Sequence, residues 1–119
     1  VGVTCNSAVS LNTEPFDVVI MDECSQCLEP LALVPLCKAK AGRMVAVGDP
    51  QQLPPTLSSQ SGESQGLEKT MFLRLANAGA DPVMLRTQYR CHPSISHISN
   101  SLFYGGRLQD GAAVVDRPP

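Results

Sequence analysis

The chain contains 119 residues with a formal net charge of −2, and 43% of its residues are hydrophobic while 17% are charged. This length suits one small domain or pieces of two, and the composition supports a packed core while excluding wholesale disorder, a membrane span and an apolar leader. The charge is uneven, since residues 1–65 carry three basic and seven acidic side chains and residues 66–119 carry six and four, but neither half has a basic patch that would favour nucleic-acid binding.

Three short apolar runs, with a candidate fourth at the start of the chain, predict buried strands: Val18–Met21, Met44–Val47, Val83–Leu85 and Val1–Cys5. The segment between the first two runs predicts a helix. Pro30 suits its first turn, Pro35 would bend or end it, and Gly42 would close the segment.

The polar, glycine-containing stretch Ser58–Gly66 predicts a mobile loop. A helix is expected after it, ending at Gly79, with one apolar stripe made of Leu67, Met71, Leu75, Phe72 and Ala76. A last helix is expected from near Pro93 to Gly105-Gly106. Its inward-facing residues would be Ile95, Ile98, Leu102 and Phe103.

Strands that alternate with helices predict an α/β fold with a mainly parallel sheet. In such sheets functional groups gather at the carboxyl ends of the strands. That rule places Asp22, Glu23 and Asp49 in one neighbourhood.

The pair Asp22-Glu23 directly follows a predicted buried strand in FDVVIMDECSQ. A carboxylate in this place can hold Mg²⁺, usually through water, and its neighbour can accept a proton from an attacking water. The alternative is structural, with Asp22 capping the next helix and Glu23 solvated in its first turn.

The second candidate segment is VAVGDPQQLPPT, where Gly48 lets the backbone turn and Gln51 and Gln52 present amides. A neutral amide can accept from a water and donate to a phosphate oxygen, which suits a sensor of the γ-phosphate. The alternative is an ordinary turn, because Gly-Asp-Pro is common turn chemistry.

The third candidate segment is LRTQYRCHPSIS. Arg90 offers a forked cation that matches phosphate oxygens, Tyr89 could stack on a base, and Gln88 could read or position a nucleotide. The alternative makes Tyr89 a core residue and Arg90 a surface residue. A metal cluster of Cys91, His92 and His97 is disfavoured, because adjacent Cys and His give poor ligand geometry.

The five cysteines are an odd number, which without a leader fits a reducing, intracellular compartment. Cys24 and Cys27 form a C-x-x-C. We interpret it as chance rather than a zinc site, because no second pair lies at metal-finger spacing. A thioredoxin-like role is disfavoured too, since the preceding carboxylates would raise a thiol pKa.

Taken together, FDVVIMDECSQ, VGDPQQLPPT and LRTQYRCHPSISHISNSLFYGGRL resemble motifs II, III and IV of superfamily 1 helicases, in the branch of the nonsense-mediated-decay RNA helicase. The sequence is most similar to the GRF-zinc-finger helicase group, which is implicated in DNA repair. The opening VGVTC resembles the segment before motif II in that branch. The resemblance covers nearly the whole chain.

The resemblance implies a RecA-like P-loop NTPase fold with two lobes, ATP between the lobes and single-stranded DNA or RNA across both. Asp22 would hold Mg²⁺, with Glu23 beside it polarising the attacking water, and Gln52 would sense the γ-phosphate. Tyr89 would stack near adenine and Arg90 would act as an arginine finger. Two further residues carry over more loosely, Gln26 as a coupling residue and Thr4 as a contact to the nucleic-acid backbone. The resemblance also implies 5′-to-3′ movement and a nuclear or cytoplasmic location.

The chain departs from the family because it holds no G-x-x-x-x-G-K-[ST] phosphate-binding loop. It starts with Val1 rather than methionine and ends on Pro118-Pro119, so we expect a segment of a longer motor. We place the end of the first lobe at residues 1–82 and the start of the second at 83–119, and expect an incomplete core and negligible ATP hydrolysis by the isolated chain.

Two alternatives remain open. One is a non-catalytic, truncated interaction fragment that keeps these residues by descent. The other is a Mg²⁺-dependent phosphohydrolase or nuclease that uses Asp22, Glu23 and Asp49, which predicts cleavage of a phosphoester without ATP. The second leaves Gln52 and Arg90 without a role.

Overall fold

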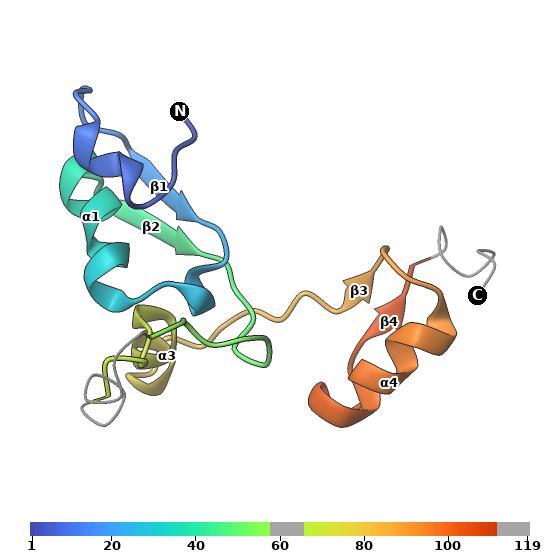
Figure 1. Ribbon diagram of the computed structural model, residues 1–119. Helices are drawn as coiled ribbons and strands as arrows, with labels where there is room; N and C mark the ends of the chain where they lie inside the picture. The colour runs from blue at the N-terminus through green and yellow to red at the C-terminus, as the bar shows by residue number, and fades with distance from the viewer. Residues whose placement is uncertain (58–65, 112–119) are drawn as a thin grey trace. The chain divides into compact units, whose positions relative to one another are not determined.

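The structure is a computed structural model of the chain and describes residues 1–57 and 66–111 (Figure 1). The chain divides into two compact units, Val1–Asp81 and Pro82–Pro119. In chain order the elements are η1 (Ser7–Ser10), β1 (Val18–Met21), η2 (Cys24–Gln26), α1 (Glu29–Ala39), β2 (Arg43–Ala46), α3 (Met71–Asn77), β3 (Thr87–Gln88), α4 (Pro93–Phe103) and β4 (Gln109–Asp110).

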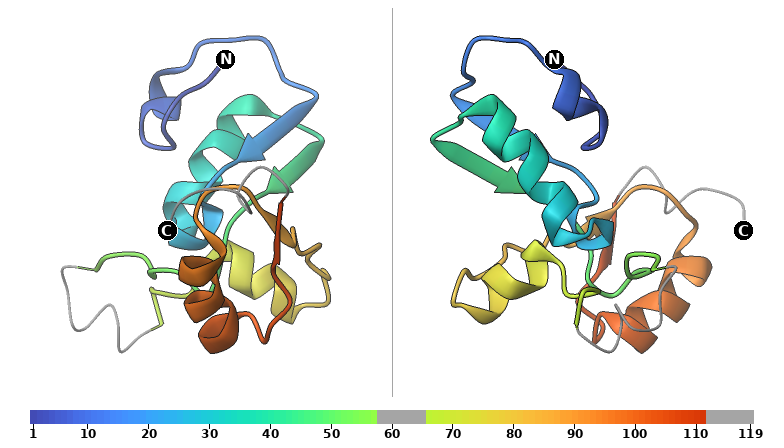
Figure 2. Two further views of the ribbon diagram at one scale, coloured as in Figure 1. Left: turned by 90° about the vertical axis from the view of Figure 1, so that its right-hand side faces the viewer. Right: turned by 60° about the vertical axis from the view of Figure 1, so that its left-hand side comes forward.

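The first unit is built on the parallel pair β1–β2, joined by α1, as Figure 2 shows. The register runs from Val18 opposite Arg43 to Met21 opposite Ala46. β1 lies where the sequence predicts it, and β2 starts one residue earlier than predicted. The strand–helix–strand order and the parallel pairing are therefore confirmed for this pair.

Helix α1 corrects two sequence-based expectations. Pro30 lies in its first turn as predicted. Of the two outcomes expected at Pro35, a bend or an end, the end is wrong, because the helix continues to Ala39. It ends in the left-handed residue Lys40, with φ 50°, whose backbone N–H donates to the carbonyl of Leu36. A lysine therefore takes the left-handed position that a glycine usually fills, and Gly42 is not needed to close the helix.

Two predicted strands are absent from the described residues. The segment 1–5 runs without strand structure into a turn and the short 3₁₀ helix η1. The segment 83–85 is also irregular, and its side chains Val83 and Leu85 are exposed. An apolar run forms a strand only where a neighbour takes its backbone N–H and C=O groups, and no described segment does so here.

Helix α3 is shorter than predicted, because it begins at Met71. The side chain of Thr70 caps it by accepting from the backbone N–H of Leu73 at 3.3 Å. Leu67 lies in the turn that precedes the helix. Gly79, with φ 98°, follows the helix end as predicted. The loop expected at 58–66 falls almost wholly on residues outside the described ranges.

The core of the first unit is small. Its buried apolar residues are Met21, Cys24, Ala32 and Met71. Val19, Met44 and Ala46 pack against them, so the sheet face that carries Met21 is covered by α1 and its neighbours. The opposite face is open, since Val18, Ile20 and Val45 are exposed.

The second unit repeats the parallel arrangement on a smaller scale. β3 and β4 pair with Thr87 opposite Gln109 and Gln88 opposite Asp110, and α4 connects them. Helix α4 begins at Pro93 as predicted, with His92 as its cap. It ends at Phe103, just before Gly105 and Gly106, which also agrees with the sequence. β4 was not predicted, because two polar residues give no apolar pattern.

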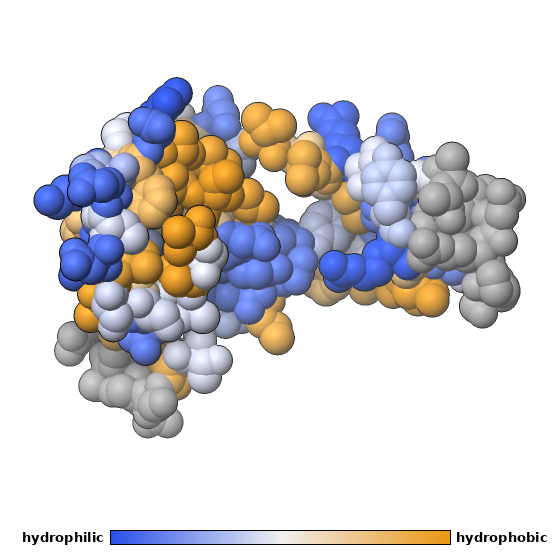
Figure 3. Space-filling view, turned by 90° about the horizontal axis from the view of Figure 1, so that it is seen from above, coloured by the Kyte–Doolittle hydropathy of each residue, from blue (hydrophilic) through white to orange (hydrophobic). Residues whose placement is uncertain are grey.

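The predicted inward face of α4 is wrong in this chain, because its four residues are exposed: Ile95, Ile98, Leu102 and Phe103. No other described segment covers this stripe. Figure 3 likewise shows apolar side chains gathered on the face of the first unit that it presents. A parallel sheet is normally covered on both faces. Open apolar faces in both units agree with the expectation of an incomplete core.

In the ranges 1–57 and 66–111, no helix is long and apolar enough to cross a membrane.

Candidate functional site

The carboxyl ends of β1 and β2 bring two of the three candidate segments together in the first unit. The N–H of Val47 donates to the carbonyl of Met21, and the N–H of Cys24 donates to the carbonyl of Val47, both at 2.8 Å. The turn after β1 therefore lies beside the turn after β2. This confirms the prediction that Asp22, Glu23 and Asp49 share one neighbourhood.

Ser25 locks these two turns to each other. Its hydroxyl accepts from the N–H of Asp49 at 2.9 Å and donates to the carbonyl of Asp49 at 3.1 Å. Gly48 makes the approach possible, because a Cβ there would lie 2.7 Å from the backbone nitrogen of Ser25. The glycine of the second segment thus serves a close contact between segments 24 residues apart in the chain.

Glu23 has a left-handed backbone, with φ 52° and ψ 33°. A non-glycine residue in this region costs about 1 kcal/mol or more, so the surrounding contacts must hold it. Its N–H donates to Asp22 Oδ1 at 3.0 Å, and its Oε2 accepts from Gln26 Nε2 at 3.2 Å. Both carboxylates are exposed.

The structure does not support the alternative in which Asp22 caps the helix that follows β1. The cap position before η2 is Glu23 rather than Asp22, and no side-chain hydrogen bond caps η2. Asp22 bonds the N–H of the next residue only. The pair therefore has no capping role in the described structure and presents carboxylate oxygens to solvent.

Asp49 organises the glutamine loop. Its Oδ1 accepts from the N–H of Gln51 at 3.0 Å and its Oδ2 accepts from Gln52 Nε2 at 2.9 Å. The expected turn chemistry is present, and it also orients the exposed side chain of Gln52. Both oxygens of Asp49 therefore accept hydrogen bonds within its own loop, and the carboxylate holds that loop in shape.

The donor set at the strand ends fits Mg²⁺ better than a metal held wholly by protein. No group of three or more His, Cys, Asp or Glu residues in the described part of the chain has metal-binding geometry. Mg²⁺ usually keeps several waters and takes one or two carboxylates together with substrate phosphates. Asp22 and Glu23 supply that number.

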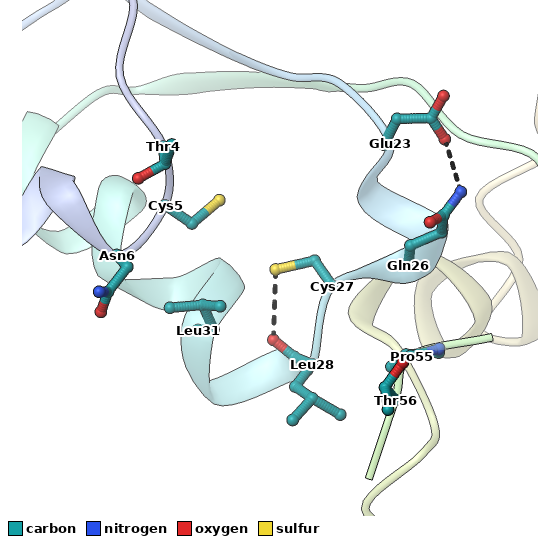
Figure 4. A pocket seen from close by; sticks show the side chains of 10 residues that line it. All are labelled: Thr4, Cys5, Asn6, Glu23, Gln26, Cys27, Leu28, Leu31, Pro55 and Thr56. Carbon is teal, nitrogen blue, oxygen red and sulfur yellow. Dashed lines mark hydrogen bonds between the residues drawn. The ribbon is translucent and has the colours of Figure 1, made fainter. Parts of the chain in front are cut away.

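A pocket of about 420 Å³ lies beside this site within the first unit (Figure 4). Glu23 and Gln26 line one side, Thr4 and Cys5 come from the N-terminal segment, and Thr56 follows the glutamine loop. Thr4 is engaged locally, since its Oγ1 accepts from the N–H of Ser7 at 3.1 Å. Thr4 and Gln26, to which the helicase resemblance assigns a nucleic-acid contact and a coupling role, therefore line the same pocket.

The thiols behind this surface are less acidic than usual. Burial and the neighbouring Cys5 raise the pKa of Cys27 to about 11. Burial also raises the pKa of Cys24. Figure 4 shows the thiol of Cys27 directed to the carbonyl of Leu28, to which it donates at 3.6 Å. The raised pKa values keep the thiols of Cys24 and Cys27 protonated near neutral pH, as expected of cysteines shielded from solvent.

The third candidate segment forms its own site in the second unit. Gln88, Tyr89 and Arg90 line a pocket of about 340 Å³, together with Ser96 and Tyr104 from α4 and its C-terminal end. Tyr89 is exposed rather than a core residue, which removes one of the structural alternatives. Its ring lies so close to Gly111 that a Cβ there would collide with it.

Sequence reasoning missed residues whose roles depend on contacts between distant segments. Ser25 bonds Asp49, and Asp110 bonds both Gln88 and Ser96. No local pattern marks these residues, because a serine in a polar stretch and an aspartate near a glycine are common on surfaces. A prediction of the parallel pairs would have been needed to find them.

Comparison with known proteins identifies the family. Two profiles described as AAA domain match the chain, one over residues 1–60 and the other over residues 67–119. The chain belongs to the AAA domain family. Such domains have a P-loop NTPase fold, with which the two small parallel pairs and their helices are consistent.

Several curated relatives are named as helicases. The chain is 49% identical to "5'-3' DNA helicase ZGRF1" of Mus musculus over 122 residues. This match covers 100% of this chain and 6% of that protein. It is 44% identical to "Helicase SEN1" of Saccharomyces cerevisiae, over 81% of this chain and 4% of that protein. It is 37% identical to "ATP-dependent helicase NAM7" of the same yeast, over 86% of this chain and 10% of that protein.

The chain therefore spans a tenth or less of the length of these relatives. The resemblance to the superfamily 1 helicase group is confirmed, and the chain covers part of the helicase domain of that group. The phosphate-binding loop of the fold is not among its residues.

Proposed function

We propose that the chain is a working segment of an ATP-dependent helicase or translocase that moves on single-stranded DNA or RNA. The observation that carries this proposal is the locked pair of turns after β1 and β2, in an AAA domain chain whose relatives are named as helicases. The two carboxylates Asp22 and Glu23 and the amide of Gln52 lie on turns held to each other by Ser25 and Gly48.

The roles of the first unit follow from its donor chemistry. Asp22 would hold Mg²⁺ through one of its carboxylate oxygens, and Mg²⁺ would neutralise charge on the phosphates of ATP. Glu23 would accept a proton from the attacking water. Gln52, oriented by Asp49, would donate its amide to a γ-phosphate oxygen. Gln26 bonds Glu23 and lines the pocket with Thr4, so it would couple the carboxylate to a nucleic-acid strand.

In the second unit, Tyr89 would stack on adenine and Arg90 would contact the γ-phosphate as an arginine finger. A guanidinium matches phosphate oxygens in shape and charge, and such a finger is typically worth about 10³–10⁵ in rate. We further propose that residues 1–82 end the first RecA-like lobe and residues 83–119 start the second.

The test is nucleic-acid-stimulated ATP hydrolysis by the complete helicase region that carries this chain. We expect Glu23→Gln to lower turnover by about 10²–10⁴, because it removes the proton acceptor while keeping the shape. Glu14→Gln, at an exposed position in the loop before β1, is the matched control and should leave turnover unchanged. Equal turnover in the Glu23→Gln protein would contradict the proposal.

Further activity measurements distinguish the helicase segment from the two alternative functions. The 119-residue chain alone should hydrolyse ATP negligibly, because its sequence has no phosphate-binding loop. Rapid Mg-ATP turnover by the chain alone would refute that expectation. Cleavage of a phosphoester without ATP, lost in Asp22→Ala, would instead indicate a Mg²⁺-dependent phosphohydrolase. A complete protein without any ATP hydrolysis would favour the non-catalytic interaction fragment.

A further inference from the structure

Gln88 closes the turn that carries Tyr89 and Arg90. Its Oε1 accepts from the N–H of Arg90 at 2.9 Å and from the N–H of Cys91 at 3.0 Å. Its Nε2 donates to the carbonyl of Cys91 at 2.8 Å. A planar amide that bonds at both ends has a fixed orientation. The backbone of residues 89–91 is therefore wrapped around one side chain.

Asp110 anchors this amide from the neighbouring strand. It lies opposite Gln88 in the β3–β4 register. Its Oδ1 accepts from Gln88 Nε2, and the same atom accepts from the hydroxyl of Ser96 at 2.7 Å. Ser96 is buried in α4. One carboxylate oxygen therefore connects β4, the end of β3 and α4.

The carboxylate is well suited to this role. The hydrogen bonds from Gln88, and then from Ser96, hold the pKa of Asp110 below its usual value. The group is therefore an anion at neutral pH, and hydrogen bonds to an ionised acceptor are stronger than bonds between neutral groups. Backbone pairing adds support, because the N–H of Gly111 donates to the carbonyl of Gln88 at 2.9 Å.

We propose that Gln88, Asp110 and Ser96 form a staple of positioning residues that holds Arg90 in place, and that Gln88 does not itself contact the nucleotide. The inference rests on the proposed function, in which Arg90 contacts the γ-phosphate. The amide of Gln88 uses both its oxygen and its nitrogen within the protein, so a nucleotide could bind it only after the turn had opened.

The staple itself can be tested in the 119-residue chain without ATP. Amide hydrogen exchange reports on the N–H groups of Arg90 and Cys91, which bond Gln88. We expect Asp110→Ala to speed exchange at both by about tenfold, since it removes an anchoring bond to a charged group. Asp110→Asn keeps an acceptor oxygen at the position used by Gln88 and Ser96 but loses the charge, so exchange should speed up clearly less than in Asp110→Ala.

A milder variant covers the case in which Asp110→Ala does not fold. Ser96→Ala removes one of the two bonds to Asp110, whereas Ser99→Ala removes a hydroxyl on the same helix that bonds only the carbonyl of Ser96. Faster exchange at Arg90 in the first variant alone supports the staple. Equal exchange in the two variants overturns it.

The functional part is tested by ATP hydrolysis in the complete helicase region. Gln88→Glu should lower kcat by about 10- to 100-fold with little change in KM, because its carboxylate faces that of Asp110 and displaces the turn. Adding Asp110→Asn supplies a donor opposite Glu at position 88 and should restore part of kcat, because the oxygen that replaces Nε2 still faces the carbonyl of Cys91. A Gln88 that reads the nucleotide would instead raise KM, and the second substitution would not rescue it.

The variant Arg90→Ala distinguishes failure of the proposed positioning role of Gln88 from failure of the proposed role of Arg90. If Arg90→Ala lowers kcat and Gln88→Glu does not, the staple is wrong and the arginine finger stands. If Arg90→Ala leaves kcat unchanged, the proposed function of Arg90 fails, and this inference fails with it.

Discussion

The two units hold their candidate residues in different ways. In the first unit the backbones of Gly48 and Ser25 approach each other closely, and the Ser25 hydroxyl bonds the backbone of Asp49 beside a left-handed Glu23. In the second unit the turn of Tyr89 and Arg90 is held by side chains, through Gln88 and Asp110. A backbone contact tolerates almost no added atom, whereas a side-chain network depends on charge and on the direction of each hydrogen bond.

The difference suits the proposed roles. A carboxylate pair that holds Mg²⁺ needs fixed oxygens, which a locked backbone provides. An arginine that contacts a transferring phosphate needs a defined direction for a long side chain, which a stapled turn provides. The predictions that follow separate these two kinds of support, from the largest expected effect to the smallest.

The largest effect is expected at Arg90. In the complete helicase region Arg90→Ala should lower kcat by about 10³–10⁵, because it removes the forked cation proposed to contact the γ-phosphate. Arg86→Ala, four residues earlier and exposed, is the matched control and should retain most of kcat. Steady-state ATP hydrolysis measures both, and similar losses in the two variants would show that general positive charge matters rather than this finger.

Burial in the first unit should slow the reaction of the Cys27 thiol with an alkylating reagent. Because its pKa is raised from 9.0 to about 11, its thiolate fraction near pH 8 should be about 100-fold below that of an ordinary thiol. Iodoacetamide should therefore modify the exposed Cys37 first and Cys27 about 100-fold more slowly, as peptide mass spectrometry would show. Equal modification rates for Cys37 and Cys27 would contradict the burial of Cys27.

The raised pKa of Cys27 also has a consequence for stability. The stability contributed by the protonated thiol is present below pH 9 and is lost as the pH rises through about 11.

Gly48→Ala tests the backbone lock directly. The added Cβ would lie 2.7 Å from the nitrogen of Ser25, so we expect a loss of about 1–3 kcal/mol in the free energy of unfolding. Gly42→Ala is the matched control, because a Cβ there meets nothing within 4 Å and should leave stability unchanged or slightly higher. Urea unfolding of the chain measures both, and equal midpoints would remove the lock from the account.

The smallest effect is expected in the titration of Asp110. Its pKa is lowered by hydrogen bonds, so the stability it contributes is present above its ordinary pKa of 3.8 and is lost as the pH falls below that value through the lowered pKa. Gln88→Ala should raise the pKa toward the ordinary value, because the bond from Gln88 is the largest cause of the shift. Carboxyl NMR titration measures this, and an unmoved pKa would show that the bond from Gln88 does not lower it.

The sequence predicted features that depend on local chemistry. β1 follows from a continuous apolar run, and α4 starts at a proline and ends before a glycine pair. The adjacency of Asp22, Glu23 and Asp49 followed from a general rule for parallel strands. Each of these predictions needed only a short pattern.

Features that depend on distant partners were not predictable in the same way. The apolar run at 83–85 is not a strand, whereas the polar pair Thr87–Gln88 is, because β4 lies beside it. Pro35 does not end α1, since a helix can lose one backbone bond when its other contacts persist. Ser25 and Asp110 bond residues 14 to 24 positions away, and no local pattern marks them.

The central claim is that the carboxylate pair of the first unit and the arginine of the second unit serve one reaction. It is tested most directly by kcat for ATP hydrolysis in the complete helicase region carrying Glu23→Gln, Arg90→Ala, or both. Residues that act on the same transition state are strongly non-additive, so we expect the double variant to be about as slow as the slower single variant. Losses that multiply independently, or a full rate in either single variant, would contradict the claim.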